Sequence, residues 1–375
     1  MCLYYLRKML YYINNFRTNT GAVMEFVYQG AIGQVNISEA ELYVDNKSRK
    51  RSGHMSHAMV EYAPGKIIAF NSNCSAVRYE GHSAFGWMEY RYSEDGGKTW
   101  SEIFEMDCSK DILHDGIYSI SVEKAVFNDG VITCFAVRNT QSGAICCEPW
   151  DTPLVIQSYD LGKTWDTPYE FSIYPGRIYD AKAYNGVIYA VETCDKDFLS
   201  EIKENRFRLF VSRDNGKSFQ EESVIDMESY KRGYAALQFR ADGALLAYSC
   251  DLLESYFIEA SISYDLGKTW KCLPHIRLKH GIRNIQIAPL GKGFVMHGRA
   301  WLNESWGMGQ VVYSSLDGVN WDDGLILNHQ KTGCYYSNMQ PVSCADGKNH
   351  VLLQYSDTYA DDSRVNVMHR FLTVD

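Results

Sequence analysis

The chain has 375 residues, a formal net charge of −9 and an aromatic content of 14% that includes 27 Tyr and 8 Trp. The negative charge argues against a nucleic-acid partner, because a phosphate backbone is bound by a basic surface. The 11 Cys are scattered without paired spacings or His partners, so we expect reduced thiols, no disulfide framework, no metal site and no cofactor.

The first 23 residues are apolar only in patches. Arg7, Lys8 and Arg17 interrupt each run before it reaches the length of a signal peptide or a transmembrane helix. We therefore expect a cytoplasmic protein without membrane association. Because Met24 opens a strand-like segment, MEFVYQGAIG, residues 1–23 are expected to lie outside the fold and residues 24–375 to form a single domain.

One octet recurs along the chain. SYDLGKTW occurs unchanged at residues 158–165 and 263–270, and related octets lie at 93–100, 212–219 and 314–321. The aromatic ends of the copies are separated by 65 residues (100 to 165), 54 (165 to 219), 51 (219 to 270) and 51 (270 to 321). A period near 50 residues suits one four-stranded blade of a β-propeller.

The chemistry of the octet is that of a turn. An Asp carboxylate can accept backbone N–H groups, Gly supplies a positive φ, and Trp can pack between neighbouring sheets. We therefore expect Asp160 and Asp265 to shape turns and not to catalyse a reaction. In the fifth copy, Leu316 stands where the pattern has Asp, so we expect that turn to be held in another way.

Each octet is preceded by alternating or continuous apolar segments that predict three strands. After the fifth octet, residues 335–357 and 363–375 supply three more strands and no octet. The segment 24–33 is a candidate for the fourth strand of that last unit, and its pairing there would close the ring and remove the open edges. The sequence thus predicts an all-β, six-bladed propeller. The paired segments of the five octet-bearing units are 54–70 and 86–92, 119–137 and 153–160, 177–192 and 206–214, 234–249 and 257–265, and 283–299 and 309–317.

On these octets the chain resembles the sialidase (neuraminidase) superfamily, whose Asp boxes, or BNR repeats, lie in the outer hairpins of successive blades. The resemblance implies six four-stranded antiparallel sheets and suggests a glycoside hydrolase. Two family features are missing. The Arg-Ile-Pro motif of the first inner strand is replaced by HMSHAMVEY at residues 54–62, and residues 71–87, where the family has its acid/base Asp, contain no Asp.

Strand direction tells which face to search for chemistry. Strands alternate in direction within a blade, so the starts of the inner strands lie on the face opposite the octet turns, and they converge near the axis. All six predicted starts are polar. They are residues 53–57, 121–124, 176–180, 231–234, 281–284 and 335–338.

The candidate catalytic residues come from these starts. The resemblance implies that Tyr336, in YYSNM, stands where the family has its nucleophilic Tyr. A phenol needs a carboxylate as base, for which Glu123 is the first candidate and Asp180 the second. His54, His57 and Glu80 are candidates for the proton donor to the leaving oxygen, since His titrates near neutral pH. Each of these residues also has a plain structural interpretation, as a hydrogen-bonded residue at a strand end.

Arginines hold carboxylates through their planar fork of donors. Arg177, Arg232 and Arg283 occupy similar positions in three consecutive blades and are expected to form such a clamp, although each could equally serve a salt bridge. Further candidates for substrate binding are Arg78, Glu80, His82, Tyr234 and Asn338.

We therefore expect an enzyme, an exo-acting glycoside hydrolase that removes a terminal sugar, with acidic sugars among the candidates, and that differs from a standard sialidase. One alternative is a polysaccharide lyase using His and Tyr as base and acid. Another is a carbohydrate-binding propeller without catalysis. In each case the expected partner is a carbohydrate, and the sequence leaves the sugar, the linkage and the oligomeric state open.

Overall fold

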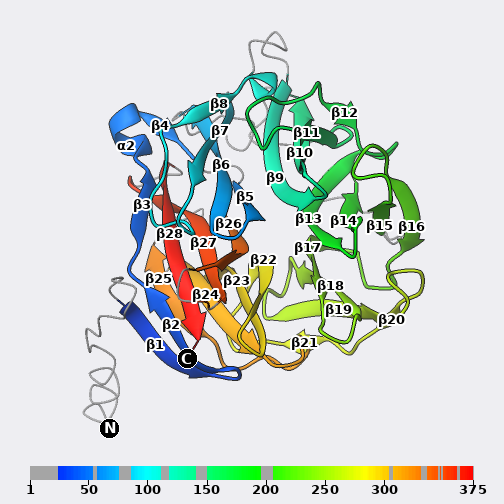
Figure 1. Ribbon diagram of the computed structural model, residues 1–375. Helices are drawn as coiled ribbons and strands as arrows, with labels where there is room; N and C mark the ends of the chain where they lie inside the picture. Colours follow the sequence, from blue (N-terminus) through cyan, green and yellow to red (C-terminus); the bar gives the residue numbers. More distant parts are fainter. Residues whose placement is uncertain are drawn as a thin grey trace.

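The computed structural model describes residues 24–53, 57–75, 86–110, 118–140, 150–195, 206–303, 307–330, 336–344, 347, 349–360 and 364–374. Six antiparallel sheets are arranged radially around a central axis (Figure 1). Helix is confined in this described part to α2 (Asn46–Arg49) and the 3-10 turn Asp107–Ser109. No described helix has the length and apolarity needed to cross a membrane. The predicted all-β, six-bladed propeller is thus confirmed.

We number the blades in chain order from the first octet. Blade 1 contains β5 (His57–Ala63), β6 (Lys66–Ser75), β7 (Gly86–Ser93) and β8 (Phe104–Met106), with β4 (Arg51–Ser52) beside β6. Blade 2 contains β9 (Tyr118–Asn128), β10 (Val131–Thr140), β11 (Leu154–Ser158) and β12 (Tyr169–Glu170). Blade 3 contains β13 (Gly176–Tyr184), β14 (Val187–Cys194), β15 (Phe207–Ser212) and β16 (Gln220–Val224). Blade 4 contains β17 (Arg232–Phe239), β18 (Leu245–Asp251), β19 (Phe257–Ser263), β20 (Lys271–Cys272) and β21 (Ile276–Arg277); blade 5 contains β22 (Arg283–Leu290), β23 (Gly293–Asn303), β24 (Gly307–Ser315) and β25 (Leu325–Gln330).

Blade 6 joins the two ends of the described chain. Its inner three strands are β26 (Ser337–Ser343), β27 (Asn349–Thr358) and β28 (Val365–Val374). The strand that pairs with β28 is β2 (Gly33–Ser38), while β1 (Met24–Gly30) pairs with the outer side of β2 and β3 (Glu41–Val44) extends the pairing along β28. Closure by an N-terminal strand was therefore predicted correctly. Segment 24–33, however, forms β1 and the turn after it, so it lies one strand farther from the axis than the strand that pairs with β28.

The hydrophobic core is divided among the blade interfaces. Among the described residues, five of the six main clusters of buried apolar side chains lie between two neighbouring blades, and the sixth, between blades 4 and 5, also includes Tyr179 and Tyr336. Because a middle strand is covered on both faces, it is buried along its whole length; every residue of β11 and β18 is buried, including the polar residues at their ends. The inner strands β5, β9, β13, β17, β22 and β26 contact one another in that order and return to β5, which closes the ring around the axis.

The octet of blade 1 shows how the turns are held. Asp95 Oδ1 accepts the backbone N–H groups of Lys98 at 3.0 Å and Thr99 at 2.9 Å, and Oδ2 accepts the Thr99 hydroxyl at 2.6 Å. Ser93 Oγ accepts the N–H of Gly97 at 2.8 Å. The octets of blades 2 and 4 repeat these bonds, which agrees with the predicted role of their Asp residues as turn formers.

The octets also fasten each blade to the one before it. A Cβ on Gly162 would lie 2.7 Å from Ile68 Cδ1 of blade 1, so only Gly allows this approach. The ring of Trp165 packs 5.6 Å from Phe70 and 5.7 Å from Tyr90, also in blade 1. The predicted packing of the octet aromatic between neighbouring sheets is therefore confirmed here.

The fifth octet corrects one sequence interpretation. Asp317 does what Asp95 does in blade 1: it accepts the Asn320 N–H at 2.8 Å and the Asn320 side-chain amide at 2.7 Å, and Ser315 Oγ accepts the Gly318 N–H at 2.9 Å. The Ser-to-Gly bond here spans three residues, where the other octets span four. The turn is thus one residue shorter and begins at Ser315, so Leu316 is an exposed side chain and not a replaced Asp.

Candidate functional site

The described starts of the inner strands meet on the face opposite the octet turns. The centre of this arrangement is Arg299, which lies near the end of β23, where it pairs in register with Arg283 at the start of β22. Its Nη2 donates to the hydroxyl oxygen of Tyr234 at 3.0 Å and to that of Tyr336 at 3.2 Å. The guanidinium also lies over the ring of Tyr336, 4.2 Å from its centroid. Blades 4, 5 and 6 thus place two phenols around one cation.

A second cluster continues the arrangement into blades 2 and 3. Arg177 Nη2 donates to Glu123 Oε1 at 2.5 Å, and both side chains are largely buried. The Arg177 guanidinium lies 4.7 Å from the ring centroid of Tyr179 and 5.3 Å from that of Trp150. The rings of Tyr179 and Tyr234 are in turn 5.2 Å apart. Side-chain contacts therefore run without a break from Glu123 to Tyr336.

Asn338 closes this chain of contacts. Its side-chain amide donates to the backbone oxygens of His57 at 3.0 Å and Glu123 at 3.3 Å, which ties blade 6 to blades 1 and 2. We call the closed set the strand-start ring; its side chains are those of Glu123, Arg177, Tyr179, Tyr234, Arg299, Tyr336 and Asn338. The ring gathers two guanidinium groups, one carboxylate and three phenols, a combination suited to binding an anionic, hydroxyl-rich ligand.

Asp180 lies elsewhere on its strand. Its Oδ1 accepts the backbone N–H of Ala181 and its Oδ2 that of Leu237, both at 2.9 Å. The ammonium groups of Lys124 and Lys182 lie 3.1 and 3.4 Å away. Burial alone would raise the pKa of this carboxyl, but the two lysines and the hydrogen bonds outweigh it, so the pKa is lowered. Both oxygens of Asp180 are thus engaged inside the propeller.

Arg232 and Arg283 are held by other groups. Arg232 Nε donates to Glu259 at 2.9 Å and its Nη2 lies 3.1 Å from Asp251. Arg283 donates to the backbone oxygen of Leu252 at 2.5 Å. Of the three predicted clamp arginines, the structure therefore brings only Arg177 into contact with the strand-start ring.

The remaining predicted residues divide into two groups. His57 is buried, and its Nε2 lies 3.4 Å from Ser356 Oγ. His54, Arg78, Glu80 and His82 lie outside the described residues. In the parts of the chain that the structure describes, no three His, Cys, Asp or Glu side chains gather as metal ligands.

Sequence reasoning missed two members of the ring. Arg299 was overlooked because only the starts of first strands were searched, whereas the end of a second strand lies beside the start of its first strand in an antiparallel pair. Its pairing with Arg283 follows from the hairpin at Gly291. Tyr179 lies in the predicted segment 176–180 but was not singled out, although Tyr and Arg side by side are a common surface for sugar binding.

Comparison with known proteins supports the fold. The BNR/Asp-box repeat family matches residues 91–102. A protein of unknown function from Dyadobacter fermentans has a TM-score of 0.65 at 16% identity, over 91% of this chain and 99% of that one. The NanB sialidase from Streptococcus pneumoniae has a TM-score of 0.59 at 10% identity, over 96% of this chain and 70% of that one. The intramolecular trans-sialidase from Ruminococcus gnavus has a TM-score of 0.57 at 13% identity, over 88% of this chain and 96% of that one. No curated protein matches the chain in sequence. The chain is an Asp-box six-bladed β-propeller with the fold of the sialidases, as its octets predicted.

Proposed function

We propose that the protein is an exo-acting glycoside hydrolase that removes a terminal acidic sugar at the strand-start ring. The observation that carries this proposal is the position of Arg299, whose Nη2 contacts the hydroxyl oxygens of Tyr234 and Tyr336. A guanidinium favours a substrate carboxylate, and it stabilises negative charge on a nearby phenol oxygen. Several proteins of the same fold are sialidases, which supports a carbohydrate substrate.

In this proposal Tyr336 is the nucleophile. Its oxygen attacks the anomeric carbon and passes its proton to a carboxylate base, while the bond to the leaving oxygen breaks and that oxygen takes a proton from a general acid. Water then attacks the same carbon, releasing the sugar and restoring the phenol. A neutral phenol suits a centre beside a carboxylate, because it approaches without charge repulsion.

We assign the base to Glu123 in preference to Asp180. The Glu123 carboxylate belongs to the strand-start ring and is oriented by Arg177 at 2.5 Å, whereas both oxygens of Asp180 accept backbone N–H groups. The proton for the leaving oxygen is assigned to the first blade, with His54, His57 and Glu80 as the candidates. This assignment replaces the acid/base Asp that the sequence lacks.

The test is a panel of chromogenic and natural glycosides offered to the wild-type protein, to Tyr336→Phe and to a control, Tyr264→Phe, which alters an exposed Tyr of the blade 4 octet. We expect hydrolysis of a terminal acidic sugar by the wild type and the control, and a loss of about 10²- to 10⁴-fold in Tyr336→Phe. An unsaturated product detected by its ultraviolet absorbance would instead identify a lyase. Glycan binding without turnover, unchanged in Tyr336→Phe, would identify a binding propeller.

A further inference from the structure

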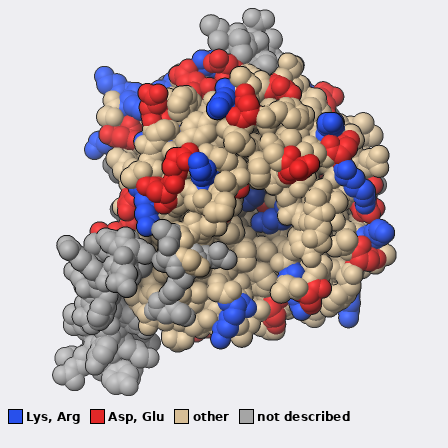
Figure 2. Space-filling model, viewed as in Figure 1, with Lys and Arg blue, Asp and Glu red and all other residues tan. Residues whose placement is uncertain are grey.

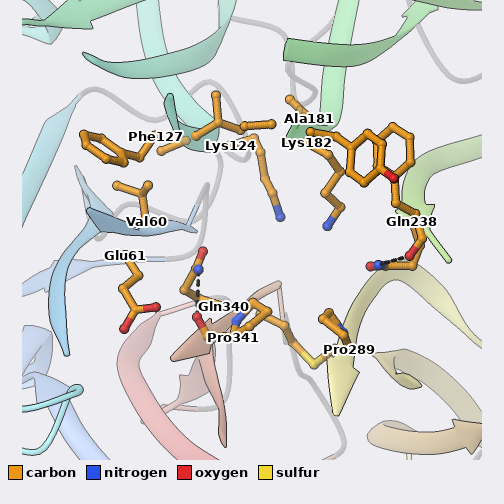
Figure 3. A pocket seen from close by; sticks show the side chains of 16 residues that line it. Val60, Glu61, Lys124, Phe127, Ala181, Lys182, Gln238, Pro289, Gln340 and Pro341 are labelled. Carbon is orange, nitrogen blue, oxygen red and sulfur yellow. Dashed lines mark hydrogen bonds between the residues drawn. The ribbon is translucent and has the colours of Figure 1, made fainter. Parts of the chain in front are cut away.

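A cavity lies on the axis, toward the opposite ends of the inner strands. It has a volume of about 270 Å³ and is lined by residues of all six inner strands. Figure 2 shows a hollow near the middle of the molecule with Lys or Arg atoms inside it. In Figure 3 the side chains of Lys124 and Lys182 extend from neighbouring strands into the pocket. No residue of the strand-start ring lines this cavity.

The two positive charges of the cavity wall lie side by side. Lys124 and Lys182 share one carboxylate partner, Asp180, at 3.1 and 3.4 Å. The three groups together carry one excess positive charge, and Lys124 is 5% exposed. Burial is the largest cause that lowers the pKa of Lys182, to about 8, and the charge of Lys124 lowers it further. A bound anion would offset both effects.

Both ammonium groups keep a donor for such an anion. A lysine has three N–H donors. Lys124 uses two of them toward Asp180 and the Asn338 side-chain oxygen, the latter at 3.3 Å. Lys182 has two long contacts, to Asp180 and to the backbone oxygen of Ile287, each at 3.4 Å. Two N–H donors from adjacent strands are thus available at one end of the cavity.

The other charged residue of the lining, Glu61, lies apart from the two lysines (Figure 3), so the positive charge is local to their end of the cavity. Glu61 Oε1 accepts the N–H groups of Gly65 and Ser343, both at 2.8 Å. Those bonds fix its carboxylate to a hairpin and to blade 6, and none joins it to either lysine. The amides of Gln238 and Gln340 donate to neighbouring backbone oxygens, and the remaining walls are largely apolar.

We propose that the axial cavity is a binding site for a small oxyanion, such as phosphate or the carboxylate of a small organic acid, held by the ammonium groups of Lys124 and Lys182. The cavity has room for such an anion, and the single excess charge of the group formed by Lys124, Asp180 and Lys182 favours an anion of low charge. The site adjoins the strand-start ring through the hydrogen bond from Lys124 to Asn338, but it shares no lining residue with the ring and does not depend on the proposed hydrolase activity.

The first test is a calorimetric titration with inorganic phosphate at constant ionic strength. The proteins are the wild type, Lys182→Met and the control Lys271→Met, which removes an exposed lysine of β20. We expect saturable binding by the wild type and the control, and an affinity at least about tenfold lower in Lys182→Met, as for the loss of one charge-assisted hydrogen bond. Equal affinities in all three proteins would overturn the proposal.

The second test does not depend on how well a variant folds. Wild-type crystals are grown with selenate, which has the shape of sulfate and gives an anomalous signal. We expect an anomalous peak within hydrogen-bonding distance of the Lys124 and Lys182 ammonium groups. An empty cavity at a selenate concentration that displaces phosphate in the titration would refute the site, whatever the outcome of the glycoside panel.

Discussion

The two faces of the propeller are built from the same strands but by different rules. On the octet face, the octets hold their turns and contact the preceding blade in nearly the same way, with an Asp accepting backbone N–H groups and a Gly packed on that blade. On the other face blades 2 to 6 contribute different side chains to the strand-start ring, and blade 1 contributes the backbone oxygen of His57. Repetition therefore marks what holds the blades together, and variation marks where a ligand-specific site can be built.

The largest expected effect comes from a substitution in the strand-start ring that leaves the octet face unchanged. We expect Arg299→Lys to lower kcat/KM by about 10²- to 10³-fold on the glycoside identified by the panel, because an ammonium cannot contact both phenols and a substrate carboxylate as a planar fork does. The control is Arg240→Lys. Arg240 follows the last residue of β17, away from the strand-start ring, and forms an exposed ion pair with Asp242. Steady-state kinetics would contradict the comparison if both variants lost activity equally.

A smaller effect is expected from the repeated face. Gly267, in the blade 4 octet, has a φ of +90°, and a Cβ there would lie 2.1 Å from Leu209 Cδ2 in blade 3. We expect Gly267→Ala to lower the free energy of unfolding by about 2–4 kcal/mol, from backbone strain and overpacking together. Gly130 has a similar φ of +79°, and a Cβ there would have nothing near it. Urea denaturation of Gly130→Ala should therefore show a loss of only about 1 kcal/mol in the free energy of unfolding. A similar loss in both variants would mean that the contact between blades adds nothing.

A third prediction concerns pH. Glu192 is buried in β14, and burial raises its carboxyl pKa to about 8. A raised pKa means that its contribution to stability is complete below the unfolded pKa and is lost as the pH rises toward 8. Over about pH 5 to 8 we expect the free energy of unfolding to fall by up to about 1.4 kcal/mol per pH unit from this group.

Glu192→Gln should flatten that slope, whereas Glu170→Gln, at a largely exposed carboxylate, should leave it unchanged. Urea denaturation at several pH values in this window measures all three proteins. An unchanged slope in Glu192→Gln would show that another group sets the pH dependence.

The smallest effect is expected at a single octet carboxylate. Hydrogen bonds, first that of the Thr164 hydroxyl, lower the pKa of Asp160 to about 2. Its contribution is therefore present above the unfolded pKa near 4 and is lost as the pH falls toward 2. Because the group is exposed and screened by solvent, we expect Asp160→Asn to cost less than about 1 kcal/mol at neutral pH. Denaturation curves of the variant and the wild type should converge near pH 2, and kcat/KM should not change.

The sequence predicted the fold well because the octets are short-range patterns with a fixed meaning. Their spacing indicates the blades, and their turns identify the face opposite the strand-start ring. Two details failed for local reasons. Ser314 and Ser315 both fit the first position of the fifth octet, so a turn shorter by one residue could not be recognised. Segment 24–33 and strand β2 both carry apolar residues that suit a strand, and only the register Val35↔Val374 shows which of them pairs with β28.

The candidate site was predictable only in part. Strand direction alone places Arg177, Tyr234 and Tyr336 on one face, and the structure brings them into one ring. Which groups touch depends on side-chain packing between blades, and no spacing in the sequence encodes it. The axial lysines were missed because the search was confined to the strand starts: Lys182 lies beyond the segment 176–180, and Lys124, at the end of the segment 121–124, was not singled out.

The pairing of β2 with β28 also affects folding during synthesis, because the two strands are made far apart in time. Val35 and Val374 are 339 residues apart (374 − 35). At about 5–20 residues per second, a ribosome needs roughly 20 to 70 s to make the partner of a strand that it has already released. During that interval the inner edge of β2, which pairs with β28 in the folded protein, is open to any other strand, including β28 of a neighbouring nascent chain. Correct closure of the ring is therefore a competition between synthesis and strand exchange, and crowded polysomes would shift it toward exchanged dimers.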